Sequence, residues 1–505
     1  MSDRDAERIP VLIGAGQVND RAATGADGLD SLGLMIAAAG KAAQDAGGDL
    51  LGRVDWLGVV SQISFPEYSG KLVDALSRAL AITPRHAVET EMPTGDSPIL
   101  LINQAANAIG RGEAQVALIV GAEALRTASK RAQEAAAKAG EEVKKTGPLP
   151  KRKPTVIETR HRYRLMTPTD VYPLYENAGR ASYGQSLAQG QAESAQIWSL
   201  FSRVAAENEA AWLRQERSSA DILEQGADNR PIAFPYNKLM VANAAVNQGA
   251  AVMVTSLAVA RAVGVPEARI IYVGKGAAAH EDDNPLLRAD FATSASMRVS
   301  LTRALELNQI GVADIDHIEL YSCFPCVPKM ARRVIGWPAE KPATVFGGLT
   351  FGGGPIGNYM THAAASMIEK LRESGVNGVL FANGGFATHN HTILFTKRPQ
   401  PAGTFPHEYD FQAEADAARG AVPELDESYE GAATIETYTV IYDRTGAPAF
   451  GVVIGRAADG RRVIGRVPAE DTSAIELLTS GAREPVGLSG RVSRDGEINR
   501  WTMAA

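Results

Sequence analysis

The sequence contains little cysteine and no long apolar run. Of its 505 residues only Cys323 and Cys326 are cysteines, which excludes a disulfide framework and indicates a reducing compartment. No stretch reaches the roughly 18 uninterrupted apolar residues of a membrane-spanning helix. The start of the sequence, MSDRDAERIP, contains no apolar signal segment. We therefore expect a cytoplasmic protein that does not bind a membrane.

An excess of positive charge is also absent. The formal net charge is -7 at pH 7 and the isoelectric point is about 5.8, which argues against a general nucleic-acid binder. Residues 126–164 are nevertheless rich in lysine and arginine. This segment is either an ordinary solvated surface or contains a few side chains that attract the phosphates of a nucleotide-like ligand.

The two cysteines, Cys323 and Cys326, stand in a C-x-x-C spacing. This spacing is typical of thioredoxin-type redox sites and of half a zinc site. Zinc would need two further ligands, which only histidine, aspartate or glutamate supply here. We expect no metal centre, and the simplest interpretation of Cys326 is a small buried apolar side chain.

Strand-like apolar runs alternate with helical patterns in two similar halves of the chain. Residues 9–18 and 56–61 flank a helical pattern, and residues 269–273, 317–321 and 378–382 are strand-like runs of the second half. This alternation predicts mainly parallel sheets with right-handed crossovers. The two halves indicate a duplicated unit whose strand ends and helix N-termini surround a shared crevice.

These patterns divide the chain into predicted domains. The first half is residues 1–265, and within it an insertion of about residues 126–235 is too long for a bare loop and is expected to form a cap. The second half, residues 266–398, is followed by a linker, residues 399–430. The last part, residues 431–505, contains five short alternating runs separated by turn residues, which predicts a small β-barrel of OB-like type.

Four segments, spread over both halves, resemble the catalytic loops of the thiolase superfamily, specifically its sterol-carrier-protein type. The first, residues 92–125, resembles the nucleophile loop, the buried helix after it and the next strand. Gly95 stands where the family has its nucleophilic cysteine, and Ser97 where it has a serine. The side chain that would accept the acyl group is therefore absent.

The second segment, residues 317–337, resembles the family's His-Asp-Cys-Phe loop, with Tyr321, Ser322, Cys323 and Phe324 in its four places. Cys323 retains the family's cysteine. A thiolate there would shuttle the α-proton of an acyl-CoA or attack a thioester if its pKa were lowered. The alternative is a small buried apolar side chain.

The third segment, residues 345–371, resembles the glycine-rich Gly-His-Pro loop. Glycines such as Gly353 let the backbone approach a ligand, and N–H groups opening the next helix would serve an oxyanion or a phosphate. Gly354 replaces the catalytic histidine. His362 lies about two helical turns further on, and is either a substitute catalyst or a core histidine.

The fourth segment, residues 378–395, resembles the Cys-x-Gly loop. Ala382 stands in the place of the second catalytic cysteine, whereas Gly384 and Gly385 of the oxyanion and coenzyme A loops are retained. His389 follows on the last strand of the core. This histidine is a candidate catalytic group, and a hydrogen-bonded strand histidine is the alternative.

Residues 238–256 resemble the segment that closes the first half of thiolases, with Asn243 and Asn247 near the expected acyl pocket. These resemblances imply the duplicated α/β thiolase fold, layered α-β-α-β-α, to which the cap and the C-terminal barrel are added. They imply coenzyme A or acyl-CoA as substrate or ligand, no tightly bound cofactor and a place in lipid metabolism. A homodimer is one assembly that the family implies.

Two hypotheses for the function remain open. Ordinary thiolysis needs an acyl-accepting thiolate, an oxyanion hole and a second base, and the replacements at 95, 354 and 382 remove most of this set. One hypothesis is an enzyme of the acyltransferase family, similar to acetyl-CoA acetyltransferase, that forms or cleaves a carbon-carbon bond, for example as a retro-aldolase on a hydroxyacyl-CoA. The other is a non-catalytic protein that binds CoA esters or lipids. The barrel is expected to be a docking or structural module without nucleic acid, because its arginines are mixed with acidic residues.

Overall fold

The computed structural model describes residues 3–22, 25–47, 50–139 and 154–504. Its largest element is a nine-stranded sheet with the order β3-β2-β4-β7-β1-β8-β11-β10-β9. The strands are β1 (Pro10–Asn19), β2 (Trp56–Val59), β3 (His86–Glu89), β4 (Val116–Glu123), β7 (Gln248–Ser256), β8 (Ile271–His280), β9 (His317–Leu320), β10 (Asn377–Gly384) and β11 (His389–Thr396).

The two halves of this sheet meet at β1 and β8, which share two residue pairs, Val11 with Tyr272 and Leu12 with Ile271. β2 runs parallel to β3 and β4, and β9 runs parallel to β10. The prediction of mainly parallel sheets is wrong, because β7 is antiparallel to β4 and to β1, and β11 is antiparallel to β10 and to β8. β11 follows β10 after the turn 385–388, which is too short for the crossover that parallel strands need.

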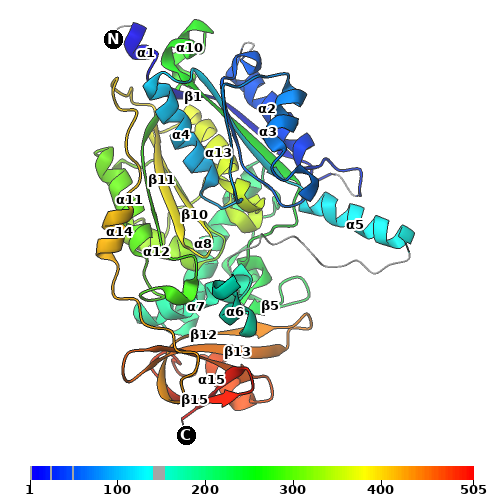
Figure 1. Ribbon diagram of the computed structural model, residues 1–505, viewed down its shortest axis with the longest axis vertical. Coiled ribbons are helices and arrows are strands. Elements are labelled where there is room, and N and C mark those ends of the chain that lie inside the picture. Colours follow the sequence, from blue (N-terminus) through cyan, green and yellow to red (C-terminus); the bar gives the residue numbers. More distant parts are fainter. Residues whose placement is uncertain (1–2, 23–24, 48–49, 140–153, 505) are drawn as a thin grey trace.

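Helices cover both outer faces and fill the layer between the half-sheets (Figure 1). The outer helices are α2 (Ser31–Ala46) and α3 (Leu72–Leu80) on the first half, and α11 (Ala295–Leu307) and α12 (Cys326–Ile335) on the second. The central helices are α4 (Ser97–Arg111) and α13 (Tyr359–Glu373), which contact strands of both halves and are largely buried. The predicted five-layer α/β arrangement is confirmed. In the described ranges, no helix combines the length and the apolar character that crossing a bilayer requires.

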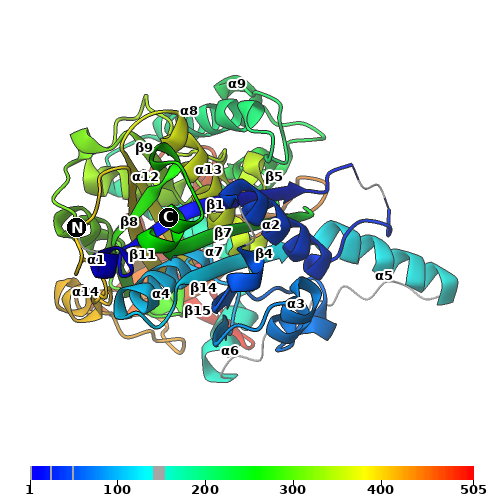
Figure 2. The same ribbon diagram turned by 90° about the horizontal axis from the view of Figure 1, so that it is seen from above.

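The segment between the halves is mainly helical. It contains α5 (Leu125–Ala139), α6 (Pro154–Arg162), α7 (Pro168–Ser182), α8 (Leu187–Glu207) and α9 (Ser219–Leu223). α5 projects away from the body of the molecule (Figures 1 and 2). Of the basic segment, residues 140–153 lie outside the described residues. Arg160 stacks on Phe386 and Arg162 pairs with Glu427, so these two basic side chains contact protein groups.

The C-terminal strands form a closed five-stranded barrel, as predicted. β12 pairs with both β13 and β15, and β14 and β16 complete the ring. Trp501 is fully buried inside it, because Gly455 and Gly490 have no side chains where its ring lies. The helix α15 (Thr472–Thr479) packs on β12 and β13. The strands are β12 (Gly431–Tyr442), β13 (Pro448–Ala457), β14 (Arg462–Pro468), β15 (Ser489–Asp495) and β16 (Ile498–Met503).

The barrel is joined to the rest of the chain by its sheet and by buried polar contacts. Its sheet continues through β5 (Pro231–Ala233) and β6 (Tyr236–Asn237) of the cap. Arg462 is fully buried, pairs with Glu436 at 2.8 Å, and donates to the carbonyl oxygens of Leu286 and Arg288 at 2.6 Å each. The linker contains α14 (Gln412–Ala418), which packs on α11.

We predict that Arg462→Ala lowers the free energy of unfolding by about 3–5 kcal/mol, because it leaves Glu436 without its closest buried cation and two carbonyls without donors. Arg491→Ala is the matched control, since Arg491 is an exposed barrel arginine, and it should change stability by less than about 0.5 kcal/mol. Urea denaturation followed by circular dichroism measures both. Equal stability of the two variants would contradict a joined barrel.

Candidate active site

The four thiolase-like segments meet at the N-terminal end of α4. A Cβ atom on Gly95 would overlap the carbonyl oxygen of Asn383 and lie 2.5 Å from Tyr321 Oη. In the third segment, a Cβ atom on Gly357 would lie 2.6 Å from the carbonyl carbon of Pro93. Glycine is therefore required at both contacts, and the structure brings together loops that are far apart in the sequence.

Tyr321 occupies the space beside Gly95, the position that the resemblance assigns to the nucleophile of a thiolase. Its ring packs edge-on against Tyr359, with 5.6 Å between the centroids. Tyr359 donates to Glu319 at 2.6 Å, and burial raises the pKa of Glu319 to about 7. Burial also raises the pKa of Tyr321 well above 10, so its hydroxyl stays protonated at neutral pH and can donate a hydrogen bond.

Asp96 is a further residue of this site, which the resemblance does not indicate. Only 6% of its surface is exposed, and its Oδ1 atom has no hydrogen-bond partner among the described residues. A Cβ atom on Gly384 would lie 2.5 Å from that oxygen. An unsatisfied buried carboxylate oxygen costs free energy and commonly marks a functional group. Its signal in the sequence is an acidic residue directly after the glycine that replaces the nucleophile.

The cap contributes Tyr172 of α7, which the sequence patterns also miss. Its Oη atom accepts a hydrogen bond from the N–H of Ala387 at 2.9 Å and lies 3.4 Å from the carbonyl oxygen of Gly385. Its ring stacks on Phe324 with 4.5 Å between the centroids. No local pattern marks this tyrosine, because its contacts depend on where the cap packs.

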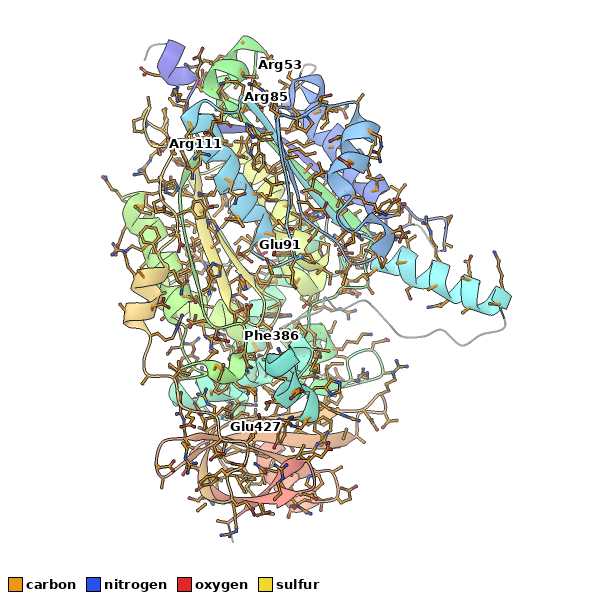
Figure 3. All side chains as sticks on the ribbon, in the orientation of Figure 1. Arg53, Arg85, Glu91, Arg111, Phe386 and Glu427 are labelled. Atoms are coloured by element: carbon orange, nitrogen blue, oxygen red, sulfur yellow. The ribbon has the colours of Figure 1, made fainter. Side chains whose placement is uncertain are left out.

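The fourth loop is fixed from several sides. Gly385 has a φ of 64°, which glycine adopts without strain. Tyr175 donates to the carbonyl of Phe386 at 2.7 Å, and Arg288 donates to the carbonyl of Ala387 at 3.0 Å. Phe386 lies between the core and the barrel in Figure 3. The loop is therefore connected to the cap as well as to the sheet.

Cys323 is 8% exposed, and burial raises its pKa to about 12. A hydrogen bond with Tyr172 lowers the pKa, but by less than burial raises it. Cys326 is buried too, with Sγ 3.8 Å from the carbonyl oxygen of Tyr172, and burial raises its pKa well above 9. Both are free thiols. At neutral pH Cys323 is a proton donor and not a thiolate nucleophile. The described residues contain no group of three or more side chains arranged to bind a metal ion.

The glycine-rich third segment contacts the segment that closes the first half. Gly353 has a φ of 111°, and its Cα lies against the side-chain amide of Gln248, which leaves no room for a Cβ atom. The N–H of Gly354 donates to the carbonyl of Asn243 at 2.9 Å, and the N–H of Asn243 donates to Leu349 at 3.0 Å. The N–H of Gly354 is thus already satisfied within the protein.

Ser97 and Asn247 have partners in the backbone and in neighbouring turns. Ser97 Oγ lies 2.9 Å from Thr94 Oγ1 at the start of α4. Asn247 Oδ1 accepts from the N–H of Thr127 at 3.0 Å, and its Nδ2 lies 3.5 Å from the carbonyl of Asp20. These bonds stabilise the first loop and the start of α5, and the predicted ligand contacts of the two residues stay predictions.

His389 lies at the edge of the site. It is paired with Gly384 in the ladder between β10 and β11. Its Nδ1 lies 3.1 Å from Nδ1 of His280, and its Nε2 lies 2.9 Å from Asp283. Its side chain is 25% exposed, so this histidine of the fourth segment is in contact with solvent.

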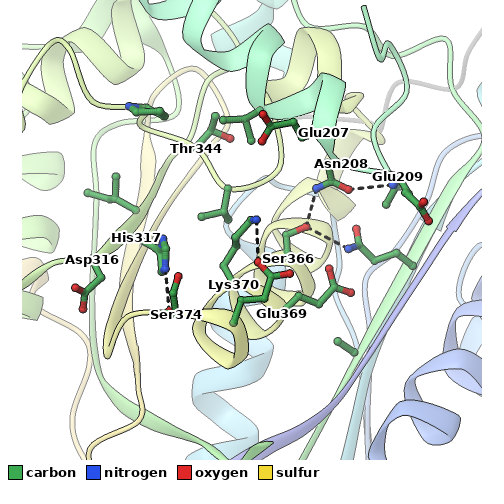
Figure 4. A pocket seen from close by; sticks show the side chains of 18 of the residues that line it. Glu207, Asn208, Glu209, Asp316, His317, Thr344, Ser366, Glu369, Lys370 and Ser374 are labelled. Atoms are coloured by element: carbon green, nitrogen blue, oxygen red, sulfur yellow. Dashed lines mark hydrogen bonds and ion pairs between the residues drawn. The ribbon is translucent and has the colours of Figure 1, made fainter.

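His362 lies in a separate environment. It is fully buried on α13, stacks on Phe346 and shares a hydrogen bond of 2.8 Å with Gln17, and burial lowers its pKa to about 3. Gln17 also donates to Ser366, which accepts a second bond from Asn208. Gln17, Ser366 and Asn208 line a cavity of about 900 Å³ (Figure 4). His317, Trp337 and Val345 of the thiolase-like segments also line this cavity, but neither His362 nor Cys323 does.

Comparisons with known families and with solved structures both relate the chain to thiolase-like proteins of type 1. A sequence model described as the additional C-terminal domain of thiolase-like protein type 1 matches residues 410–497. The crystal structure of a monomeric SCP2-thiolase-like protein type 1 from Mycobacterium smegmatis is 31% identical, covers 99% of both chains and has a TM-score of 0.83. No curated protein sequence matches the chain.

More distant structures share the fold alone. The Ltp2-ChsH2(DUF35) aldolase is 17% identical and has a TM-score of 0.60 over 78% of this chain and 100% of that one. Human mitochondrial 3-ketoacyl-CoA thiolase in complex with CoA is 15% identical and has a TM-score of 0.56 over 77% of this chain and 98% of that one. The core is therefore of thiolase type.

We predict that Gly95→Ala lowers the free energy of unfolding by about 1–3 kcal/mol, because the new methyl group collides with Asn383 and Tyr321. Gly40→Ala in α2 is the matched control, since an added Cβ meets nothing within 4 Å there, and it should stabilise by up to about 1 kcal/mol. Chemical denaturation measures both. An unchanged stability of Gly95→Ala would mean that the space beside Gly95 is not filled by Asn383 and Tyr321.

A second prediction concerns the thiols. With a pKa of about 12 instead of 9, Cys323 should react with a thiolate-specific reagent about 1,000-fold more slowly than a free cysteine at pH 8. The rate should rise about tenfold with each pH unit and level off only near pH 12, whereas the rate of a free cysteine levels off near pH 9. Ellman titration of native protein should detect no rapidly reacting thiol, and titration in guanidinium should detect both. A fast native thiol at pH 8 would contradict the raised pKa.

Proposed function

The chain belongs to the family of SCP2-thiolase-like proteins of type 1, and from this premise we propose that it binds an acyl-CoA thioester at the thiolase-type site and cleaves a carbon-carbon bond there without an acyl-enzyme. The observation that carries the proposal is the pair of groups beside Gly95. The protonated hydroxyl of Tyr321 replaces the nucleophile, and the unpartnered carboxylate oxygen of Asp96 lies next to the fourth loop.

These groups suit a reaction that needs proton transfer but no covalent carrier. Retro-aldol cleavage of a 3-hydroxyacyl-CoA begins when a base removes the proton of the 3-hydroxyl group. The bond between C2 and C3 then breaks, its electron pair forms the thioester enolate, and an acid protonates C2. The products are a carbonyl compound and a shorter acyl-CoA.

We assign these steps by position and hydrogen bonding. Asp96 is the base, because its buried Oδ1 atom has no hydrogen-bond partner among the described residues. Tyr321 donates a hydrogen bond to the enolate oxygen, and Cys323 gives its proton to C2, since burial keeps both groups neutral. The proton on Asp96 then returns to the Cys323 thiolate through a water molecule, which restores the starting state.

The remaining candidate residues have supporting roles in this proposal. Gly384 allows the backbone of the fourth loop to approach Asp96, Gly385 gives that loop its turn, and His389 exchanges protons with solvent through Asp283. His362 takes no part, because its ring is hydrogen-bonded to Gln17 and stacked on Phe346. One structural neighbour is described as an aldolase, which agrees with the proposed reaction class at the level of the fold.

A second candidate function is binding of an acyl-CoA without catalysis. The burial of Tyr172, Tyr321 and Cys323, all in contact with protein groups, favours it, because a packed site lacks room for reacting groups to move. The homodimer stays a prediction, and the relative from Mycobacterium smegmatis is described as monomeric.

The test follows the chromatographic conversion of a panel of 3-hydroxyacyl-CoA and 3-ketoacyl-CoA esters. We expect turnover of hydroxyacyl esters only. Asp96→Asn should lower kcat at least about 100-fold because the base is lost. Tyr321→Phe should lower it about 10- to 1,000-fold through loss of an oxyanion donor. Asp74→Asn, an exposed acid on α3, should not change it.

Calorimetry with the same esters separates the two functions. Binding without turnover supports the non-catalytic protein. Turnover that survives both Asp96→Asn and Tyr321→Phe would remove these residues from the mechanism. The absence of binding by every ester would defeat both functions.

A further inference from the structure

A second cavity, of about 350 Å³, lies outside the site assigned above. It is bounded by the N-terminal turn of α11, by α12, by Tyr183 directly after α7 and by the end of α14 with the residues that follow. None of the residues assigned to the proposed reaction lines it. Its volume lies within the range of small-molecule sites, and its walls come from the second half, the cap and the linker.

Arginine dominates the charge of this cavity. Its lining contains four arginines and two carboxylates, namely Arg288, Arg298, Arg333, Arg419, Glu281 and Asp290. Two of the arginines have carboxylate partners. Arg333 pairs with Glu193 at 2.7 Å, and Arg419 pairs with Glu281 at 2.9 Å.

The other two arginines have no carboxylate at hydrogen-bond distance among the described residues. Arg298 is exposed on α11. Arg288 is 2% exposed, stacks on Tyr175 and donates to the carbonyl oxygens of Ala387 and Thr293, each at 3.0 Å. Its charge lowers the pKa of Glu281, but its Nε atom is buried without a hydrogen-bond partner in the described part of the chain. A buried guanidinium with an unused donor favours an anion nearby.

The two carboxylates of the lining are already used by other donors. Glu281 Oε1 accepts from the N–H of Ser296 and from the hydroxyl of Ser294, and its other oxygen accepts from Arg419. Asp290 accepts from the N–H and the hydroxyl of Thr293. These acids are therefore bound in turns and ion pairs, which leaves the exposed Arg298 and the unpartnered Nε atom of Arg288 as donors for a ligand.

The rest of the lining is apolar. It includes Met297, Met330, Val334, Ala292 and Ala295. A phosphate or another fully hydrated ion would leave this surface without a partner, whereas an apolar chain would cover it. The lining therefore favours a ligand with one charged end and an apolar body.

We propose that this cavity is a binding site for a small organic carboxylate with an apolar chain. The carboxylate lies at Arg298 and Arg288, and the chain lies between Met297 of α11 and Met330 of α12. The proposal does not depend on the reaction assigned to Asp96. The cavity and the candidate active site share one contact, because Arg288 also donates to the carbonyl oxygen of Ala387 in the fourth loop.

The test is calorimetry of the full-length protein with sodium octanoate and with its neutral counterpart octanamide. We expect octanoate to bind at least about tenfold more tightly, because only the anion forms charge-assisted hydrogen bonds. Arg298→Gln should weaken octanoate binding about tenfold. Arg78→Gln removes the same charge from an exposed position on α3 and should have no effect.

A second variant tests the cavity without changing its charge. Ala292→Leu places three more carbon atoms in the lining and should reduce octanoate binding at least about tenfold by excluding the chain. Circular dichroism and acyl-CoA binding of each variant verify that the fold is retained. The proposal is overturned if octanoate does not bind at millimolar concentration, if octanamide binds equally well, or if both Arg298→Gln and Ala292→Leu bind octanoate like the unmodified protein.

Discussion

Helix α7 is buried on every side between Val171 and Arg180, and both the candidate site and the barrel depend on this burial. Towards the core, Tyr172 contacts the fourth loop, and Glu176 pairs with the buried Lys329 of α12 at 2.5 Å. Towards the barrel, Asn177 donates to the carbonyl of Tyr438 at 2.9 Å. A charged pair without water around it tolerates the loss of neither partner. The barrel therefore covers a helix whose buried polar side chains, such as Asn177, would otherwise be exposed to solvent.

The replacement of a nucleophile by a tyrosine changes the chemistry available in the pocket. A thiolase separates an acyl group from its enolate by holding it on sulfur. Here Tyr321 fills that volume, and burial keeps Tyr321 and Cys323 neutral. A site with these neutral donors and the buried carboxyl group of Asp96 suits the proposed proton transfer and thioester binding, but it lacks the charged thiol for acyl transfer. The same packing explains why glycine is required at 95 and 384.

Much of the fold follows from patterns in the sequence. Glycines at 353, 384 and 385 and the alternation of strands and helices predict the duplicated scaffold, and the turn residues after 431 predict the barrel. The strand directions are not predictable in this way, because β7 and β11 are buried like the parallel strands, and their directions depend on the connections that precede them. Cys323 keeps its place in a recognisable loop, but its protonation follows from its burial in the folded chain.

The sequence by itself determined that the acyl-accepting cysteine is missing and that four loops of thiolase type remain, because these properties belong to single positions and short spacings. Only the tertiary structure decided what replaces the nucleophile. The approach of Tyr321 to Gly95, the burial of Asp96 beside Gly384 and the contact of Tyr172 with Ala387 join segments from both halves and the cap. Such contacts depend on the packing of helices that are distant in the chain, so no local pattern of residues contains them.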